Sequence, residues 1–180
     1  MLQSTETILV IVDVQGKLAR IMSQTEQLHQ RLQVLAQAMP LFDIPVLWLE
    51  QLPDKLGPTS PELATLLQAY TQPIAKQHFS GWQCDSFRQQ LQASGRRQVL
   101  LAGIETHICV YQTCCDLLNE GLEVHVIADA VDSRHQENRV LGLQMMQQRG
   151  AWLTQTESLL FELQQQASGE RFRQLLSLIK

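Results

Sequence analysis

The stretch VLLAGIETHICVYQTCCD, from Val99 to Asp116, combines a buried strand with the start of a helix. Its first residues are apolar and typical of a strand covered on both faces, and Gly103 ends that run. Apolar spacing indicates a helix that continues to Asn119, with Thr106 as its N-cap. Cys109 would then lie in the first helical turn, where unpaired N–H groups and the helix dipole favour a thiolate. Cys109 is therefore a candidate nucleophile.

Strand and helix patterns alternate along the chain on both sides of this stretch. Apolar and β-branched runs bounded by turn residues predict strands over residues 7–12, 46–49, 74–76, 98–102, 124–128 and 151–154. Apolar residues at helical spacing predict helices over residues 24–39, 61–70, 85–93, 106–119, 136–148, 156–165 and 169–179. Such alternation is typical of βαβ units. We predict a single domain over residues 1–180 with a three-layer α/β/α, Rossmann-like fold around a six-stranded, mostly parallel sheet.

Composition narrows the class of protein. The 180 residues are 44% hydrophobic and 18% charged, with a formal net charge of −4, as in an ordinary globular domain. Lysine and arginine form no basic stripe, so we expect no nucleic-acid partner. The N-terminus does not resemble a signal peptide and no apolar stretch is long enough to span a bilayer, so we expect no membrane partner and a cytoplasmic location. Apolar residues in the last two predicted helices favour a homo-oligomer, a dimer or larger.

The cysteines give no sign of a metal or disulfide scaffold. They are Cys84, Cys109, Cys114 and Cys115. Their spacing fits neither a disulfide framework nor a zinc site, and we predict no cofactor. We interpret Cys114 and Cys115 as core packing within the predicted helix, and Cys84 as a bystander.

The carboxyl ends of parallel strands meet at one edge of a sheet, where ligands bind. Side chains suited to chemistry follow five of the predicted strands: Asp13, Glu50, Gln51, Lys76, Glu105 to Cys109, Asp129 and Asp132. An acid, a lysine and a thiol therefore converge at this edge. Taken alone, Asp13 is equally a capping residue, and Lys76 is more typical of a solvated surface lysine. His107 and Cys109 are two residues apart, so they point to different faces of a helix.

Four segments, in order along the chain, carry a resemblance to a known family. They are VIVDVQ at residues 10–15, PVLWLEQ at 45–51, KQHFS at 76–80, and GIETHICVYQT at 103–113 with GLEVHVIADAVDSR at 121–134. Together they resemble the isochorismatase-like (cysteine hydrolase) superfamily, and within it the small isochorismatase-domain proteins. The resemblance implies an Asp-Lys-Cys triad of Asp13, Lys76 and Cys109. It also implies oxyanion donors in the backbone N–H groups of Glu105 and Cys109, and a cis peptide bond between Ile104 and Glu105.

The resemblance further implies covalent hydrolysis without a metal. Asp13 would accept the proton of Cys109, and Lys76 would pair with Asp13 and favour the thiolate. The thiolate would attack a carbonyl-type carbon, and water would cleave the resulting thioester. We therefore expect a hydrolase of a small amide, ureido or ester compound.

Other residues bear on the ligand. Loops and first helical turns beside the triad suggest a partly apolar pocket for a small molecule, lined by Gln15, Leu18, Gln51, Phe79, Trp82 and Tyr111. Relatives of the nicotinamidase type bind a divalent metal through histidines, but this chain has no histidine between His29 and His78, so we predict no metal. Two alternatives stay open: vinyl ether hydrolysis of the isochorismate type, and a non-catalytic module that binds a ligand or senses redox state through Cys109.

Overall fold

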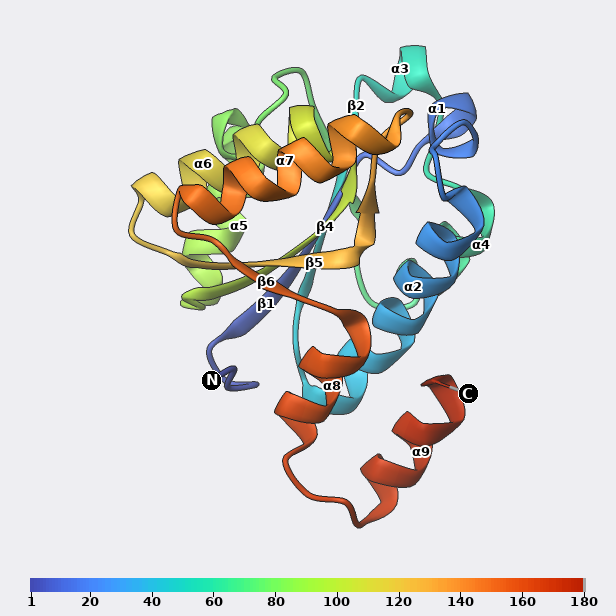
Figure 1. The fold of residues 1–180 in the computed structure, drawn as a ribbon, viewed down its shortest axis with the longest axis vertical. Helices are drawn as coiled ribbons and strands as arrows, with labels where there is room; N and C mark the ends of the chain where they lie inside the picture. Colours follow the sequence, from blue (N-terminus) through green and yellow to red (C-terminus); the bar gives the residue numbers. More distant parts are fainter. Residues whose placement is uncertain (180) are drawn as a thin grey trace.

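Strand β1 (Thr7–Val12) lies in the middle of the sheet in the computed structural model, which describes residues 1–179 (Figure 1). The sheet has six strands in the order β3-β2-β1-β4-β5-β6, and every pairing between these strands is parallel. The other strands are β2 (Val46–Gln51), β3 (Pro73–Lys76), β4 (Gln98–Ile104), β5 (Glu123–Asp132) and β6 (Trp152–Thr154). The predicted α/β fold is confirmed, and the direction of strand succession reverses between β1 and β4.

The helices follow the strands as the alternating pattern predicts. They are α1 (Gly16–Arg20), α2 (Thr25–Ala38), α3 (Pro53–Leu56), α4 (Pro61–Leu67), α5 (Asp85–Ser94), α6 (Tyr111–Asn119), α7 (Gln136–Gln148), α8 (Thr156–Gln164) and α9 (Glu170–Ile179), with shorter turns η1 (Met39–Phe42), η2 (Gly81–Gln83) and η3 (Thr106–Val110). The sequence prediction lacks α1, α3, η1 and η2, because each is too short for its apolar periodicity to be read.

Two helical layers cover the sheet, which confirms the three-layer prediction (Figure 1). Alternate side chains of β1 enter different cores: Leu9 and Ile11 pack with α2, α4, α8 and α9, whereas Ile8, Val10 and Val12 pack with α5, α6 and α7. All six residues of β1 are buried. A strand covered on both faces reads as a continuous apolar run, which is why this one was recognisable in the sequence.

Gly103 allows β1 and β4 to approach closely at their carboxyl ends. Its φ is +113°, and a Cβ atom added there would lie 2.1 Å from the carbonyl oxygen of Val12. Any other residue at this position would collide with the β1 backbone. The close approach brings the residues that follow β1 and β4, Asp13 and Glu105, to the same end of the sheet at the point where the strand order reverses.

Strand β5 is longer than predicted and absorbs two acidic residues expected beyond its end. A register shift in its pairing with β4 lets it continue to Asp132. The Asp129 carboxylate accepts hydrogen bonds from the Thr156 backbone at 2.8 Å and hydroxyl at 2.9 Å. The Asp132 carboxylate accepts from the Gln24 backbone at 2.6 Å. Both aspartates therefore anchor the starts of helices on the α2–α8 face. Within residues 1–179, no helix has the length and apolar character needed to cross a bilayer.

Candidate active site

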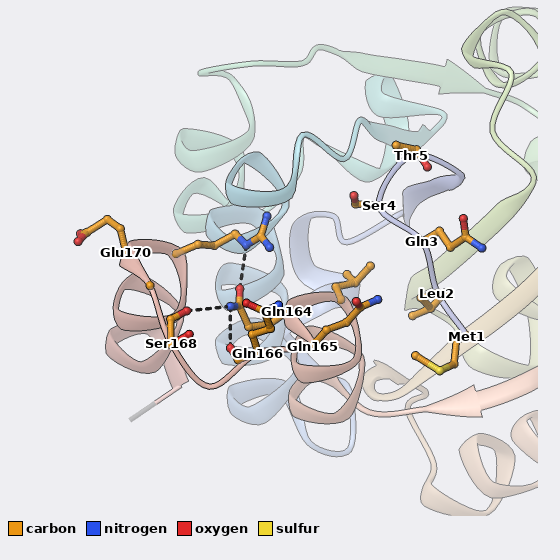
Figure 2. A pocket seen from close by; sticks show the side chains of 13 residues that line it. Met1, Leu2, Gln3, Ser4, Thr5, Gln164, Gln165, Gln166, Ser168 and Glu170 are labelled. Carbon is orange, nitrogen blue, oxygen red and sulfur yellow. Dashed lines mark hydrogen bonds between the residues drawn. The ribbon is translucent and has the colours of Figure 1, made fainter.

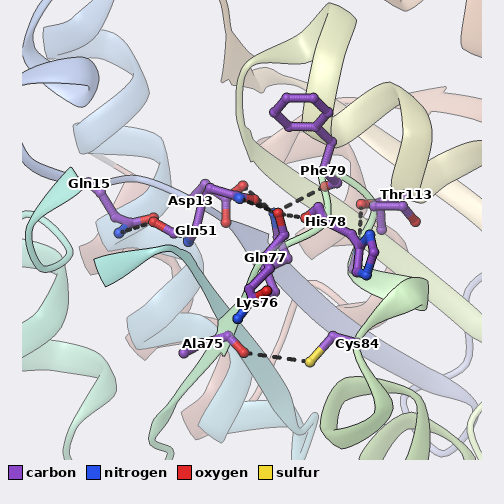
Figure 3. Close-up of polar contacts among 12 residues, drawn as sticks. Asp13, Gln15, Gln51, Ala75, Lys76, Gln77, His78, Phe79, Cys84 and Thr113 are labelled. Carbon is purple, nitrogen blue, oxygen red and sulfur yellow. Dashed lines mark hydrogen bonds and ion pairs between the residues drawn. The ribbon is translucent and has the colours of Figure 1, made fainter. Parts of the chain in front are cut away.

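The acid, the lysine and the thiol predicted from the sequence come together at the carboxyl edge of the sheet. Asp13 follows β1, Lys76 ends β3, and Cys109 lies on η3 after β4. The Lys76 Nζ lies 2.6 Å from the Asp13 Oδ2, and Figure 3 shows the two side chains in contact. The Cys109 thiol interacts with the same carboxylate and affects its pKa. The three residues are 2%, 3% and 8% exposed, respectively, so the cluster is almost fully removed from solvent.

Lys76 is not a surface lysine, which was the more typical interpretation of this residue alone. Besides Asp13, its Nζ donates to the Gln51 Oε1 at 2.7 Å and to the carbonyl oxygens of His78 at 3.1 Å and Phe79 at 3.0 Å (Figure 3). In β3 alternate residues are buried, and Lys76 falls on the buried side. The ammonium is therefore fixed in place by one carboxylate and three neutral oxygen atoms.

The electrostatics of the cluster favour a neutral thiol at rest. Burial and, after it, the nearby Asp13 charge raise the pKa of the Cys109 thiol to about 12, although the Lys76 ammonium opposes both. The prediction that Cys109 rests as a thiolate is therefore wrong, because burial and a neighbouring carboxylate outweigh the helix dipole. Burial also raises the pKa of Asp13 above its ordinary 3.8, opposed by Lys76 and the thiol. The carboxylate is thus a stronger base than a solvated aspartate.

One carboxylate oxygen of Asp13 has no hydrogen-bond partner among residues 1–179. The Asp13 Oδ2 accepts from Lys76, whereas the Oδ1 is buried and accepts no hydrogen bond from a nitrogen or oxygen donor of residues 1–179. The backbone of Asp13 has a φ of +54°, an uncommon conformation for a residue with a side chain. Strained positions of this kind cluster at functional sites.

The segment between β4 and α6 has an unusual backbone. The peptide bond between Ile104 and Glu105 is cis, which confirms the expectation from the resemblance. Residues Thr106–Val110 form one turn of π-helix, in which the Val110 N–H donates to the Glu105 carbonyl oxygen at 3.3 Å. The prediction of Thr106 as N-cap is wrong: Glu105 occupies that position, and the buried Thr106 hydroxyl has no hydrogen-bond partner among residues 1–179.

The carboxylate of Glu105 and the backbone of His107 tie this turn to the rest of the fold. The Arg134 Nε lies 3.2 Å from the Glu105 Oε1, and the Arg134 backbone N–H donates to the Oε2 at 3.0 Å. A Cβ atom added to Gly142 on α7 would lie 3.0 Å from the His107 Cα, so the helix packs directly on the turn. The His107 Nδ1 is committed to a hydrogen bond with the Ser133 hydroxyl at 3.0 Å.

The predicted pocket residues lie in several different surroundings. Phe79 and Tyr111 line a cavity of about 570 Å³ beside the loop whose carbonyl groups hold Lys76. Gln15 and Gln51 are buried, and their amides form hydrogen bonds within the protein. Leu18 is half-buried and packs against the core on the α2 side.

The structure does not bring Trp82 to this site. The Ser80 hydroxyl accepts from the Trp82 backbone N–H at 3.2 Å, and the η2 turn directs the indole inward. Trp82 lies in the core on the α5–α7 face, beside a small cavity of about 240 Å³ that Gly95 and Leu122 also line. Cys114 is fully buried as predicted, but Cys115 is half-buried and lines the same cavity as Phe79, so its assignment to the core is wrong.

Two remaining features lie outside the thiol cluster. Glu50 accepts hydrogen bonds from the Thr59 backbone and hydroxyl, both at 2.7 Å, and so anchors the loop after β2. A cavity of about 710 Å³ lies between the N-terminal residues and the connection from α8 to α9 (Figure 2). Its buried Gln164 is satisfied by Gln166 and Arg171. No group of three or more His, Cys, Asp or Glu side chains that could hold a metal ion occurs within residues 1–179.

The sequence analysis missed the link between Gln51 and Lys76, because nothing local marks a glutamine as the partner of a lysine 25 positions later. It also missed the pairing of Glu105 with Arg134. Both contacts depend on which strands become neighbours, which is a property of the folded sheet.

Comparison with known proteins identifies the family. The model of the isochorismatase domain matches residues 7–158. The chain belongs to the isochorismatase family. Isochorismatase domain-containing protein 2A from Mus musculus is 37% identical over 175 residues, which cover 97% of this chain and 82% of the mouse protein. A secreted isochorismatase effector from Phytophthora sojae is 34% identical, covering 97% of this chain and 84% of the effector.

Solved structures of isochorismatase-like proteins share the fold. One described as the MAR1 ribonuclease from Caenorhabditis elegans superposes with a TM-score of 0.93 at 33% identity, covering 99% of this chain and 91% of that one. The YcaC protein from Escherichia coli, described as an octameric hydrolase of unknown specificity, gives a TM-score of 0.92 at 22% identity, covering 98% and 89% of the two chains. The chain therefore has the fold of isochorismatase-like proteins as well as a sequence of that family.

Proposed function

We propose that this isochorismatase-family protein is a metal-independent cysteine hydrolase of a small amide, ureido or ester compound. The observation that carries the proposal is the arrangement of the Asp13 carboxylate. One of its oxygens is held by the Lys76 ammonium at 2.6 Å, the other is buried with no hydrogen-bond partner among residues 1–179, and the Cys109 thiol interacts with the same carboxylate. A base with one free oxygen next to a neutral thiol is suited to removing the thiol proton during attack.

The reaction has two halves. In the first, Asp13 takes the proton of Cys109 while the sulfur bonds to the carbonyl carbon, and the carbonyl oxygen becomes an oxyanion. The backbone N–H groups of Glu105 and Cys109 are the proposed donors to that oxyanion. The intermediate then collapses to a thioester, and the departing amine or alcohol takes the proton from Asp13. In the second half, Asp13 removes a proton from water, the hydroxide adds to the thioester carbon, and Cys109 leaves and is reprotonated as the acid is released.

The donor set at the end of β2 supports a reaction without a bound metal. Glu50 is the carboxylate nearest to that strand end, and both of its contacts from Thr59 are already made at 2.7 Å. The amide of Gln51 is committed to Lys76 and to the Gln77 carbonyl. The Gln51 amide, with both of its polar atoms committed, is not free to act as a metal ligand in this arrangement.

Turnover of a panel of small amides, ureido compounds and esters tests the proposal, with Cys109→Ser as the central variant. We expect the variant to lose at least about a thousandfold in kcat/KM and the wild type to show an acyl adduct on Cys109 by mass spectrometry. Cys84→Ser is the matched control that removes a thiol elsewhere and should keep activity. Wild-type turnover that survives in Cys109→Ser would overturn the proposal.

The same variants separate the alternatives. Vinyl ether hydrolysis of the isochorismate type would persist in Cys109→Ala, because it needs no thioester. A redox sensor would give a sulfenic acid or mixed disulfide on Cys109 and no turnover of any compound in the panel. An RNA substrate belongs in the panel because the C. elegans structure is described as a ribonuclease. The net charge of −4 disfavours that substrate here.

We also propose a homo-oligomer in the cytoplasm. Large apolar side chains stay exposed on this chain, among them Ile21 at 59%, Leu141 at 52% and Trp152 at 63%. Contact between copies would bury such surface. Light scattering coupled to size-exclusion chromatography tests the assembly, and a monomer at micromolar concentration contradicts it. Cell fractionation tests the location, for which the secreted relative is the relevant contrast.

A further inference from the structure

Gln51, the last residue of β2, makes contacts that fix its side-chain amide in one orientation (Figure 3). Its Oε1 accepts from the Lys76 Nζ at 2.7 Å, and its Nε2 donates to the Gln77 carbonyl oxygen at 2.7 Å. Rotating the amide by half a turn would put an NH₂ group against an ammonium and an oxygen against a carbonyl. The Gln51 backbone N–H also donates to the Gln15 Oε1 at 2.6 Å, so the strand end that carries it is held as well.

We propose that Gln51 is a positioning residue whose uncharged amide holds the Lys76 ammonium without neutralising it, so that the positive charge stays available to the proton exchange between Cys109 and Asp13. The inference rests on the proposed role of Cys109 as the nucleophile. With a neutral residue at position 51, Lys76 carries the positive charge and Asp13 the negative charge. When the proton moves from the thiol to Asp13, the negative charge moves to the sulfur and the total stays the same.

The charges around the thiol explain why a neutral amide matters. Three carboxylates from three strands act on this cluster: Asp13 and Glu105 act on Cys109, and Glu50 acts on Asp13. Glu105 is paired with Arg134, and the Cys109 thiol already has a pKa of about 12. The His78 and Phe79 contacts to Lys76 come from backbone carbonyl groups and carry no charge. A fourth carboxylate on Lys76 would make the cluster bind its proton more tightly, because Lys76 is the charge that opposes the existing ones.

Gln51→Glu and Gln51→Met separate this role from hydrogen bonding alone. Glutamate has the shape of glutamine and keeps an acceptor for Lys76, whereas methionine keeps the volume but neither polar atom. Both variants lose the donor to the Gln77 carbonyl. A role in hydrogen bonding alone predicts that methionine is the more harmful change, because methionine loses the acceptor for Lys76. The proposal predicts the opposite order, because only glutamate adds a negative charge.

The readout is the rate at which iodoacetamide alkylates Cys109 as a function of pH, measured by peptide mass spectrometry on the full chain. In this reaction the sulfur bonds to the methylene carbon, iodide leaves, and the thiol proton passes to Asp13 or solvent. We expect Gln51→Glu to react at least about tenfold more slowly than wild type near neutral pH, with its profile displaced to higher pH, and Gln51→Met to lie between them. Gln72→Glu adds the same charge at an exposed position directly before β3, and its alkylation rate should match that of wild type.

The outcomes are distinct for each idea. If Gln51→Glu alkylates at the wild-type rate, or faster than Gln51→Met, the positioning role is overturned whether or not the protein hydrolyses any compound. If Gln51→Glu is alkylated slowly but wild type hydrolyses no compound in the panel, the positioning role of Gln51 is supported and the hydrolase proposal fails. Thermal denaturation of both variants shows that each is folded in the assay, and Gln51→Glu should melt no lower than Gln51→Met because it gains an ion pair with Lys76.

Discussion

Lys76→Met removes one partner of a fully buried ion pair, and its cost can be worked from the structure. The side chain of Lys76 is 0% exposed, and its Nζ lies 2.6 Å from the Asp13 Oδ2. Without the ammonium, Asp13 must stay charged in a buried site or take up a proton. Proton uptake limits the cost. The ordinary pKa of an aspartate, 3.8, lies about three pH units below pH 7. Protonating Asp13 at pH 7 costs about 1.4 kcal/mol for each of these units, so the loss of stability is limited to about 4 kcal/mol.

Urea unfolding measures this cost. Near pH 7 we expect the free energy of unfolding to fall by about 3–4 kcal/mol, in line with other buried pairs that lose one partner. In the variant the pKa of Asp13 is raised further above its unfolded value, so the deficit grows with pH and shrinks by about 1.4 kcal/mol for each pH unit on going from about pH 7 to about pH 5. Lys17→Met, at an exposed position, should change stability by less than about 0.5 kcal/mol.

A second substitution checks the cause. Adding Asp13→Asn to Lys76→Met removes the unpaired charge, and asparagine tolerates the φ of +54° at this position. The double variant should therefore be more stable than Lys76→Met alone near pH 7. The reasoning is refuted if Lys76→Met lies within about 1 kcal/mol of wild type near neutral pH, or if its deficit is the same near pH 5 and pH 7.

Three other substitutions test features of the fold. Gly103→Ala should lower the free energy of unfolding in urea by about 4 kcal/mol or more, because the added Cβ meets the β1 backbone. Gly95→Ala, which has open space around it, should lower it by about 1–2 kcal/mol. Equal losses in the two variants would contradict the close approach of β1 and β4. Glu50→Ala should cost about 2–4 kcal/mol by releasing both Thr59 contacts, and Glu50→Gln should keep most of that stability. Tyr70 is 40% exposed, and its partial burial raises the pKa of the phenol from 10.0 to about 12, so wild type should lose stability between those pH values as the unfolded phenol ionises first. Tyr70→Phe should lessen that loss, and an identical pH profile would count against the burial of the phenol.

The sequence predicts the layers of this fold well because its strands are covered on both faces. Such strands read as apolar runs, and the turn residues between them mark where each helix begins. The ends of helices and strands are harder to predict from the sequence. Strand β5 runs on to Asp132 because its polar residues anchor helices that come from elsewhere in the chain, so the polar end of the run does not mark the end of the strand.

The candidate site, too, can be predicted only in part from the sequence. Asp13, Lys76 and Cys109 are recognisable from the strand ends that carry them and from the resemblance to the family. The protonation state of the Cys109 thiol cannot be predicted from the sequence, because it depends on burial and on carboxylates that other strands bring close. The direction of Trp82 likewise depends on a three-residue turn that a sequence pattern does not distinguish from a loop.

The position of β3 in the sheet has a consequence for how the site works over time. β3 has four residues, is the outermost strand on its side and pairs with β2. Outer strands detach by local fluctuations that need far less free energy than global unfolding. Each detachment would withdraw the ammonium from the thiol while the central strands stay intact. The fraction of molecules with Lys76 in place is then set by the equilibrium between attached and detached β3. Amide hydrogen exchange in β3 measures that equilibrium.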